Sequence, residues 1–300
     1  MLRPPDLRPG DTIAIISPAG IARRPATEEA SDLLRSRGWN IKIMPHALGR
    51  HGSFSGTAEQ RASDLREAIT DPDIKAILCS RGGYGAVHLL DMISPKLITD
   101  NPKWLIGFSD ISALHCLWLK AGVESIHGPM AKHILASAAT ESVNPLDLRH
   151  LEQILMGKRI EYQLDPHPLN HFGLASGTLI GGNFSVISAL ADTLFDPFRT
   201  PDAILFIEDI NEPVYKIERL IYRLRLRAGD NIKGLIIGNF TGVGSDVNHA
   251  SIYDMIHSAT APMHIPVAFA FPAGHGGSAS PLILGSKTTL RVDDQGVVIS

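Results

Sequence analysis

The sequence contains only two cysteines among its 300 residues, Cys79 and Cys116. So few thiols exclude a scaffold held together by disulfides, and reduced cysteines are typical of a cytoplasmic protein. The histidines offer no zinc spacing: His167 and His171 lie four residues apart, but Pro168 between them opposes a regular helix. We therefore expect no disulfide, and the sequence predicts no metal ion and no cofactor.

The chain also lacks a surplus of basic residues, with 28 lysines and arginines against 31 aspartates and glutamates and a net charge of -3. This balance excludes the electrostatic footprint by which proteins bind nucleic acid or an anionic membrane surface. No apolar run reaches the length of a membrane span, and the first residues contain no apolar core of signal-peptide length. We therefore expect a cytoplasmic protein whose partner is a small molecule.

Short apolar runs alternate with amphipathic segments through the first half of the chain. Strands are predicted at 11–17, 39–44, 74–79, 104–106 and 123–127, and helices around 30–34, at 58–69, from 111 and at 145–156. Such alternation is typical of βα units and a mostly parallel sheet. In such sheets the loops beyond the carboxyl ends of the strands form the functional site. The sequence therefore predicts an N-terminal α/β domain over residues 1–157, with helices flanking the sheet.

Prolines and histidines accumulate after residue 157, where the apolar periodicity weakens, and we interpret 158–175 as a linker. A second, smaller α/β domain is expected over 176–300. Its strands are predicted at 203–207, 232–240 and 266–271, its helices at 185–191 and after Pro213, and a terminal hairpin or edge pair at 288–292 and 297–299. The predicted fold is thus a two-domain α/β protein.

A sharp corner separates the predicted strand at 104–106 from the helix that begins near Ile111, and Ser109 stands at that corner. A serine there has its hydroxyl lifted above the strand end, and the N–H of Asp110 points out of the first helical turn without an intrahelical partner. One turn thus offers a nucleophile and half of an oxyanion hole. The pattern G-x-S-x-x lacks the last glycine of G-x-S-x-G, however, and a serine that merely caps the helix fits the same residues.

The glycine-rich segment S-R-G-G-Y-G at 80–85 also lies between a predicted strand and a helix. Its G-G-x-G spacing differs from the G-x-G-x-x-G of dinucleotide-binding proteins, so we do not favour a nucleotide loop. Gly82 and Gly83 can instead let the backbone approach a substrate closely and offer N–H groups to an oxyanion. A tight turn without a function is the simpler alternative.

Candidate acids and a candidate base follow later strands. Glu208 and Asp209 stand where a buried strand emerges, which suits an orienting carboxylate, but solvated turn acids fit the composition as well. Asp209 and Glu212 can also cap the following helix. His275 follows a strand end and is flanked by glycines, so its ring can reach a neighbour without steric obstruction. We interpret His115, on the helix after the corner, as a core histidine.

Ser109, Glu208 and His275 lie in this chain order, each beyond a predicted strand end. Nucleophile, orienting acid and base are the three roles of a catalytic triad, and these residue types can fill them. His127 is a further candidate base. We interpret Cys79 as inert packing, because it ends a buried apolar strand. The sequence alone does not give the distances between these residues.

Seven motifs span nearly the whole chain and read L-R-P-G-D-T-I-A-I-I-S-P-A-G, S-R-G-G-Y-G-A, G-F-S-D-I-S-A-L-H, H-G-P-M, G-G-N-F, F-I-E-D-I-N-E-P-V-Y-K-I-E-R and A-G-H-G-G. In this order they resemble the serine peptidase family of L,D-carboxypeptidases. These are the murein tetrapeptide carboxypeptidases, and the family also contains the microcin C self-immunity hydrolases. By the matching motifs, Ser109 is the implied nucleophile, Glu208 the implied triad acid and His275 the implied base.

The resemblance also implies that the oxyanion is bound by the N–H groups of Asp110 and of either Gly82 or Gly83. It implies a homodimeric serine carboxypeptidase that needs no metal. Its implied reaction is removal of the terminal D-alanine from murein tetrapeptides in the cytoplasm, during peptidoglycan recycling. Ser112 replaces a threonine that is frequent in the family, and the segment after A-G-H matches only loosely, which leaves substrate contacts there open.

Two other functions stay open. A hydrolase of aminoacyl-nucleotide conjugates would share the triad, but such enzymes tend to carry an inserted loop with an aromatic residue for the nucleobase. The segment after Met156 offers Tyr162 and Phe172 but no tryptophan. A non-catalytic muropeptide binder on the same scaffold is the other alternative. The sequence does not identify the residue that binds the terminal carboxylate of a peptide, although Arg81 is the nearest cation along the chain.

Overall fold

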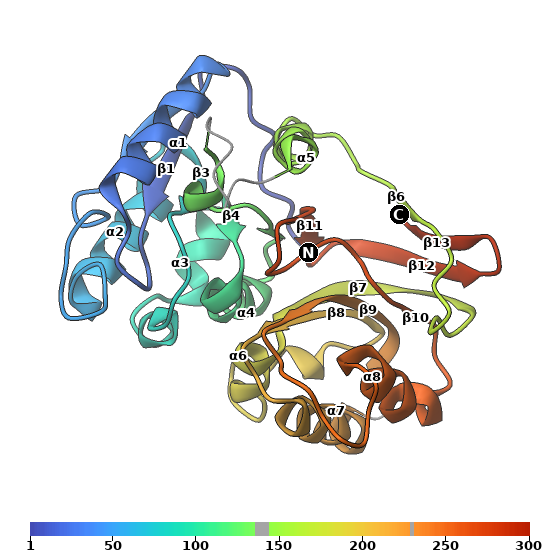
Figure 1. Cartoon of the computed structure of the whole chain (residues 1–300). Coiled ribbons are helices and arrows are strands. Elements are labelled where there is room, and N and C mark those ends of the chain that lie inside the picture. The colour runs from blue at the N-terminus through green and yellow to red at the C-terminus, as the bar shows by residue number, and fades with distance from the viewer. Residues whose placement is uncertain (136–143, 229–230) are drawn as a thin grey trace. The chain divides into compact units, whose positions relative to one another are not determined.

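The computed structural model describes residues 1–135, 144–228 and 231–300. These residues form two compact units, Met1–Lys158 with Gly277–Leu284 and Arg159–Gly276 with Gly285–Ser300. Both units combine helices with a sheet, as the sequence predicts, and the second unit is the smaller one (Figure 1). The chain therefore leaves the first unit after Lys158, returns to it for 277–284, and ends in the second unit.

The first unit is built on a mostly parallel sheet whose strands lie in the order β11-β5-β4-β3-β1-β2. These strands are β1 (Thr12–Ile16), β2 (Asn40–Ile43), β3 (Ile74–Cys79), β4 (Trp104–Gly107), β5 (Ser125–His127) and β11 (Leu282–Leu284). β11 runs antiparallel to β5, and the other pairings are parallel. Apolar, buried side chains fill β1, β3 and β4 almost without interruption, which is typical of a parallel sheet with both faces covered.

Five helices of the first unit lie in its described residues. They are α1 (Arg24–Ser36), α2 (Ala58–Thr70), α3 (Pro95–Asp100), α4 (Ser112–Ala121) and α5 (Pro145–Leu155). α2 begins at a capping box, in which Thr57 Oγ1 accepts the N–H of Gln60 and the Gln60 side chain accepts the N–H of Thr57. Leu65 and Ile69 of α2 point inward, as the periodicity predicts. The sequence did not predict α3, whose six residues bury Ile98 alone.

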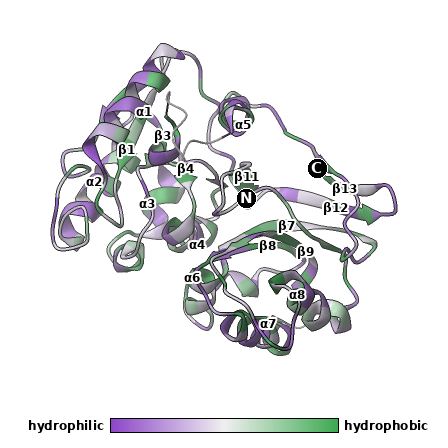
Figure 2. Cartoon of the chain, in the orientation of Figure 1, coloured by the Kyte–Doolittle hydropathy of each residue, from purple (hydrophilic) through white to green (hydrophobic). Residues whose placement is uncertain are grey.

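The second unit contains a mixed sheet in the order β10-β9-β8-β7-β12-β13-β6. Its strands are β6 (Tyr162–Leu164), β7 (Gly173–Asn183), β8 (Ala203–Ile210), β9 (Ile232–Thr241), β10 (Val267–Ala268), β12 (Lys287–Asp293) and β13 (Gly296–Ile299). β7 to β10 are parallel, and β12, β13 and β6 extend the sheet in antiparallel fashion. Figure 2 shows mainly hydrophobic residues along β7, β8 and β9, consistent with their central place in this sheet.

The helices α6 (Phe184–Ala189), α7 (Val214–Ala228) and α8 (Ile252–Thr260) lie on the same side of β7, β8 and β9 in Figure 1. α7 follows Pro213, as predicted, and buries Val214, Ile217, Ile221 and Leu224 at helical spacing, while Leu220 is half-buried. The sequence did not predict α8. No helix in the described part of the chain is both long and apolar enough to cross a membrane.

The C-terminal strands form the expected hairpin, because β12 and β13 pair antiparallel. The segment 158–175, which we expected to be a linker, instead contains β6, and β6 pairs with β13. The start of β7 at Gly173 also lies within it. Pairing between strands so far apart in the chain leaves no local periodicity, and short strands such as β6 are therefore missed by a sequence pattern.

Candidate active site

Ser109 occupies a strained corner directly after β4. Its backbone φ is 66°, in the left-handed region that residues other than glycine rarely adopt. Ser109 opens a 3-10 turn (Ser109–Ile111) that leads into α4, so the N-cap positions fall on Phe108 for the turn and on Ile111 for α4. The interpretation of Ser109 as a helix cap is therefore wrong. The half-buried side chain instead lies at a strand-turn-helix corner of the kind that presents catalytic nucleophiles.

The loop 80–85 follows β3 and comes into contact with this corner. A Cβ on Gly82 would lie 2.9 Å from both Cβ and Oγ of Ser109 and 3.3 Å from the backbone N of Asp110. Only a glycine lets the loop backbone approach the serine so closely. Gly83 faces a different neighbour, since a Cβ there would lie 3.2 Å from Cα of Gly20. Of the two glycines that the sequence left as alternatives, Gly82 is the one beside Ser109.

Asp110 joins the corner to the same loop through its side chain. Its buried carboxylate accepts the N–H of Ala86, with 2.8 Å between Oδ2 and N. Burial raises the pKa of the Asp110 carboxyl, and the hydrogen bond from Ala86 opposes that rise. The backbone N–H of Asp110 belongs to the first turn after the corner, where N–H groups lack intrahelical partners. Asp110 thus offers one N–H near Ser109 and fixes the end of the loop.

Glu208 and His275 form a close pair within the second unit. Glu208 lies in β8 with a fully buried side chain, and its Oε2 is 2.7 Å from Nδ1 of His275. The same oxygen accepts the backbone N–H of His275 at 3.2 Å. A Cβ on Gly274 would lie 2.7 Å from Oε2 of Glu208, so a glycine is needed directly before the histidine. A carboxylate on Nδ1 holds the imidazole in the tautomer whose Nε2 can accept a proton.

Asp209, the neighbouring carboxylate, points to the opposite face of β8, because successive residues of a strand alternate. Its oxygens accept the N–H and hydroxyl of Ser185 at 2.8 and 2.7 Å and the side-chain amide of Asn183 at 3.0 Å. Asp209 therefore caps the start of α6, and the expectation that it caps α7 is wrong. Burial raises the pKa of the Asp209 carboxyl, and the bonds from Ser185 counteract this. Glu212, two residues before α7, forms an ion pair with Lys216 in the first turn of that helix.

The structure confirms that His115 is a core residue. Its Nδ1 lies 2.8 Å from Ser125 Oγ and its Nε2 2.9 Å from the carbonyl of Gly107, and burial lowers its pKa to about 4. Cys79 is fully buried at the end of β3, and burial raises the pKa of its thiol, which confirms it as inert packing. His127 is buried in β5, with its ring centroid 5.6 Å from that of Phe108.

Arg61 and Asp147 are among the buried charged residues of the first unit that sequence reasoning missed. Arg61 on α2 is 2% exposed and donates hydrogen bonds to three loop carbonyls. Asp147 on α5 accepts from the hydroxyls of Ser278 and Ser280 and from the N–H of Ala279, at 2.7 to 3.1 Å. For Arg61 the available signal was a charged residue within the apolar stripe of a predicted helix. Asp147 gave no signal, because its partners lie in a distant segment of the chain.

Other polar side chains that the sequence singled out have local partners. Arg81 Nη1 donates to the carbonyl of Ile21 at 3.2 Å. His171 Nε2 lies 2.8 Å from Nδ1 of His257, and His167 stacks on the ring of Phe269. Among residues 1–135, 144–228 and 231–300, no group of three or more His, Cys, Asp or Glu side chains is arranged to hold a metal ion.

Comparison with known proteins assigns both halves of the chain. Residues 13–128 match the LD-carboxypeptidase N-terminal domain and residues 176–290 match the LD-carboxypeptidase C-terminal domain. A putative carboxypeptidase of Synechocystis is 33% identical over 298 residues, covering 97% of this chain and 95% of the relative. The murein tetrapeptide carboxypeptidase of Pseudomonas aeruginosa is 31% identical over 290 residues, covering 93% and 92%.

A solved structure supports the same assignment. The MccF-like protein of Bacillus anthracis superposes with a TM-score of 0.87 at 25% identity, covering 100% of this chain and 98% of that one. MccF is a microcin C7 self-immunity protein. Family matches over most of the chain, relatives above 30% identity and a shared fold agree, and the chain therefore belongs to the LD-carboxypeptidase family of hydrolases.

Proposed function

We propose that this protein is a serine L,D-carboxypeptidase that removes the terminal D-alanine from murein tetrapeptides. The observation that carries the proposal is the corner at Ser109, with its positive φ and with Gly82 packed against its hydroxyl. Strain of this kind persists where the surrounding structure enforces it, and it is frequent at catalytic nucleophiles. A serine that serves only the fold has no need of a strained backbone and a loop glycine against its Oγ.

In the proposed mechanism His275 takes the proton of Ser109 as its oxygen attacks the carbonyl of the amide before D-alanine. Glu208 holds the imidazole through Nδ1 and stabilises the positive charge that forms on the ring. The proposal requires Nε2 of His275 to come within hydrogen-bond reach of Ser109 Oγ in the working enzyme. The protonated imidazole then gives its proton to the leaving amine, and water hydrolyses the acyl-enzyme by the same route in reverse.

The tetrahedral oxyanion would be bound by the backbone N–H groups of Asp110 and Gly82. Gly82 is favoured over Gly83 because it is the loop residue in contact with Ser109. Donors fixed in this way stabilise the transition state more than the ground state, and losing one typically costs about 3 kcal/mol of activation free energy.

The murein tetrapeptide is the substrate favoured by the relative of 31% identity that carries this name. Peptides of this kind return to the cell interior when the wall is recycled, so the proposed role places the enzyme in the cytoplasm. We propose a homodimer, as the family resemblance implies, which sedimentation can test.

An aminoacyl-nucleotide conjugate is the second candidate substrate, favoured by the close fit to the MccF-like fold. Enzymes that cleave such conjugates tend to carry an accessible aromatic ring for the base. Tyr162 does not offer one, because it is buried in β6 with its ring centroid 5.1 Å from that of Phe271. Phe172 is 66% exposed and stays a candidate. The murein peptide therefore remains the preferred substrate, with a non-catalytic muropeptide binder as the alternative outside enzymes.

Mass spectrometry of the reaction products distinguishes these functions. The protein is incubated with L-Ala-γ-D-Glu-meso-diaminopimelate-D-Ala and, separately, with an aminoacyl sulfamoyl adenosine, and Ser109→Ala serves as the control. We expect loss of one D-alanine from the tetrapeptide with wild-type protein and no loss with the variant. Cleavage of the adenosine compound alone would move the role to nucleotide conjugates, and cleavage of neither would favour the binder.

A further inference from the structure

Arg61 is a buried arginine whose position has no explanation in the packing of α2 alone. It lies on the inward side of the helix, in the same stripe as Leu65 and Ile69, and is 2% exposed. A guanidinium carries five N–H donors, and leaving them without acceptors in a buried place is costly. The acceptors that it finds therefore indicate what the residue holds in place.

The guanidinium bridges three separate loops of the first unit. Nη1 donates to the carbonyl of Pro18 at 2.6 Å and to that of Gly85 at 2.8 Å, and Nε donates to the carbonyl of Gly56 at 3.2 Å. Nη2 lies 3.1 Å from Nδ1 of His88. Pro18 follows β1, Gly56 precedes α2, and Gly85 ends the glycine loop after β3. One side chain thus connects the loop 80–85 to two neighbouring loops.

The end of the glycine loop packs closely against Phe54 and Arg61. Gly85 has a φ of 111°, and a Cβ there would lie 2.7 Å from the ring of Phe54 and 3.3 Å from Arg61 Nη1. The next residue, Ala86, donates its N–H to the carboxylate of Asp110. Arg61 therefore holds Gly85, and Asp110, a buried group of opposite charge beside Ser109, holds the next residue, Ala86.

The two charges also stabilise one another. Burial lowers the pKa of the Arg61 guanidinium, and the charge of Asp110 opposes that shift. In the same way the charge of Arg61 is among those that counteract the raised pKa of Asp110. At its other end the loop is fixed by Ser80, whose Oγ lies 2.6 Å from Oγ of Ser17. Between these anchors Gly82 is held against Ser109.

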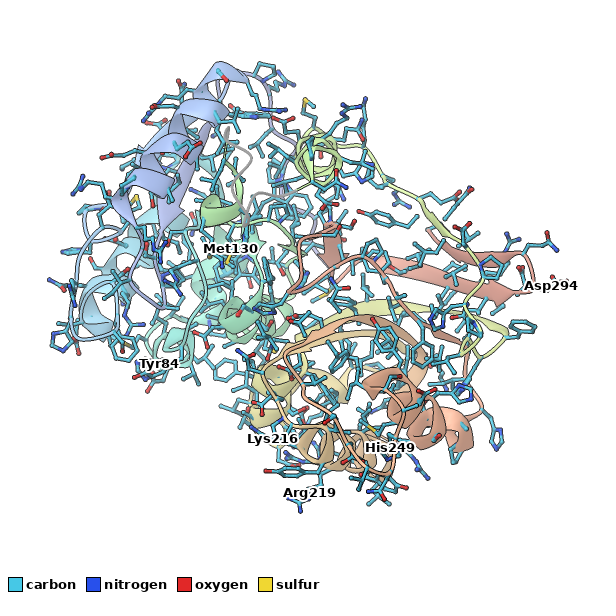
Figure 3. All side chains as sticks on the ribbon, viewed as in Figure 1. Tyr84, Met130, Lys216, Arg219, His249 and Asp294 are labelled. Atoms are coloured by element: carbon cyan, nitrogen blue, oxygen red, sulfur yellow. The ribbon has the colours of Figure 1, made fainter. Side chains whose placement is uncertain are left out.

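We propose that Arg61 is a positioning residue for the oxyanion hole: it fixes the loop 80–85 so that the Gly82 backbone stays against Ser109. This inference rests on the proposed serine mechanism. Arg61 lies in the first turn of α2 and acts through the loop that it anchors. Tyr84, which Figure 3 labels, lies on the same loop and is 59% exposed, and its ring centroid is 4.7 Å from that of Phe54.

The role predicts a specific kinetic signature. An oxyanion donor acts in the transition state, so its displacement lowers kcat and leaves ground-state binding of the peptide nearly unchanged. A lysine keeps the charge of Arg61 but presents its donors from one point, and it cannot bridge carbonyls that a planar fork reaches on different sides. We therefore expect Arg61→Lys to lower kcat about 100-fold, as misplacement of a catalytic group by about 1 Å can do, with KM changed less than threefold.

The test compares Arg61→Lys and Arg61→Met with Arg66→Met. Arg66 lies on the same helix but is exposed, and its Nη2 donates to the carbonyl of Met92 at 3.1 Å. For each protein kcat and KM are measured by D-alanine release, together with the inhibition constant of a peptidyl phosphonate that mimics the tetrahedral intermediate. Peptide affinity is measured by calorimetry in the Ser109→Ala background. Circular dichroism establishes that each variant is folded.

We expect both Arg61 variants to weaken phosphonate binding in proportion to the loss of kcat/KM, while peptide affinity in the Ser109→Ala background stays within threefold of its value with Arg61. Arg66→Met should match wild type in every measurement. If Arg61→Met does not fold, Arg61→Lys decides by the same criteria. Two results with folded Arg61→Lys protein would overturn the inference and leave the proposed function intact. They are an unchanged kcat, and an increase in KM without a decrease in kcat. Wild-type protein that neither releases D-alanine nor binds the phosphonate would overturn the proposed function and the inference with it.

Discussion

Glu208 and His275 share one carboxylate oxygen: Oε2 of Glu208 lies 2.7 Å from Nδ1 of His275 and also accepts the backbone N–H of His275 at 3.2 Å. The carboxylate therefore fixes the ring and the loop that carries it. Its side chain is fully buried in β8, so water does not compete for the oxygen. This pairing sets which ring nitrogen can act as a base, because Nδ1 is committed to the acid.

The first prediction concerns this pair. Glu208→Gln preserves size and burial, but the amide can donate to Nδ1 and so favours the tautomer with its proton on Nε2. We expect kcat for D-alanine release to fall by roughly 10³ to 10⁴, with the fold intact by circular dichroism. Kinetics at pH 7 check this expectation. Activity within tenfold of wild type would show that Glu208 does not orient the base.

The second prediction concerns Gly82, whose added Cβ would lie 2.9 Å from Oγ of Ser109. Gly82→Ala forces the loop or the serine to shift, and we expect a loss of kcat of at least about 100-fold. Gly122→Ala is the control. Gly122 directly follows α4 with a φ of 72°, and an added Cβ would meet no atom within 4 Å. The variant should therefore lose about 1 kcal/mol of stability and keep its kcat. Equal activity of the two variants would contradict the role of Gly82.

The third prediction concerns pH and His115, whose pKa is lowered to about 4 by burial. The unfolded chain binds a proton on this histidine near pH 6.5 and the folded chain does not, so stability falls as the pH drops from 6.5 towards 4. This difference in proton binding lowers the free energy of unfolding by about 2 kcal/mol between pH 7 and pH 5. We expect His115→Gln to be less stable at pH 7 but to lose less stability on acidification. Denaturant titrations at the two pH values measure this, and an equal loss in both proteins would refute it.

The fourth prediction concerns Asp147, which accepts three hydrogen bonds from the segment 278–280. Asp147→Ala leaves the buried N–H of Ala279 without its acceptor, and we expect a loss of about 2 to 4 kcal/mol in the free energy of unfolding. Ser278→Ala removes one 3.1 Å bond from a half-buried hydroxyl and should cost about 1 kcal/mol or less. Urea denaturation compares the two variants. A cost for Asp147→Ala no larger than that for Ser278→Ala would contradict the anchoring role.

Much of the fold could be predicted because its elements carry local signals. β3 matches the apolar run at 74–79 residue for residue, and α2 follows the expected helix at 58–69 to within one residue. The short strands β6 and β11 could not be predicted, because each is defined by a partner far away in the chain. α3 is too short to show a periodicity, since only Ile98 of its six residues is buried. α8 was missed although its buried residues Met255, Ile256 and Ala259 follow helical spacing.

In the candidate site, too, some residues could be predicted from the sequence and others could not. Sequence order and motif resemblance single out Ser109, Glu208 and His275. Ser109 follows the end of β4 as predicted, but Glu208 lies within β8 and not beyond it, because β8 continues to Ile210. The strain at Ser109 and the choice of Gly82 over Gly83 depend on how two loops approach each other, which no pattern within either loop encodes. Arg61 is the extreme case, since its acceptors come from three loops.

The most direct test of the central claim is to trap the acyl-enzyme. The protein is mixed with the murein tetrapeptide, quenched in acid within the first turnovers, digested and examined by mass spectrometry, with D-alanine release followed in parallel. We predict a tripeptide acyl group on Ser109, together with free D-alanine, and neither product with Ser109→Ala. Undiminished D-alanine release by Ser109→Ala, with no adduct on wild-type Ser109, would contradict the account.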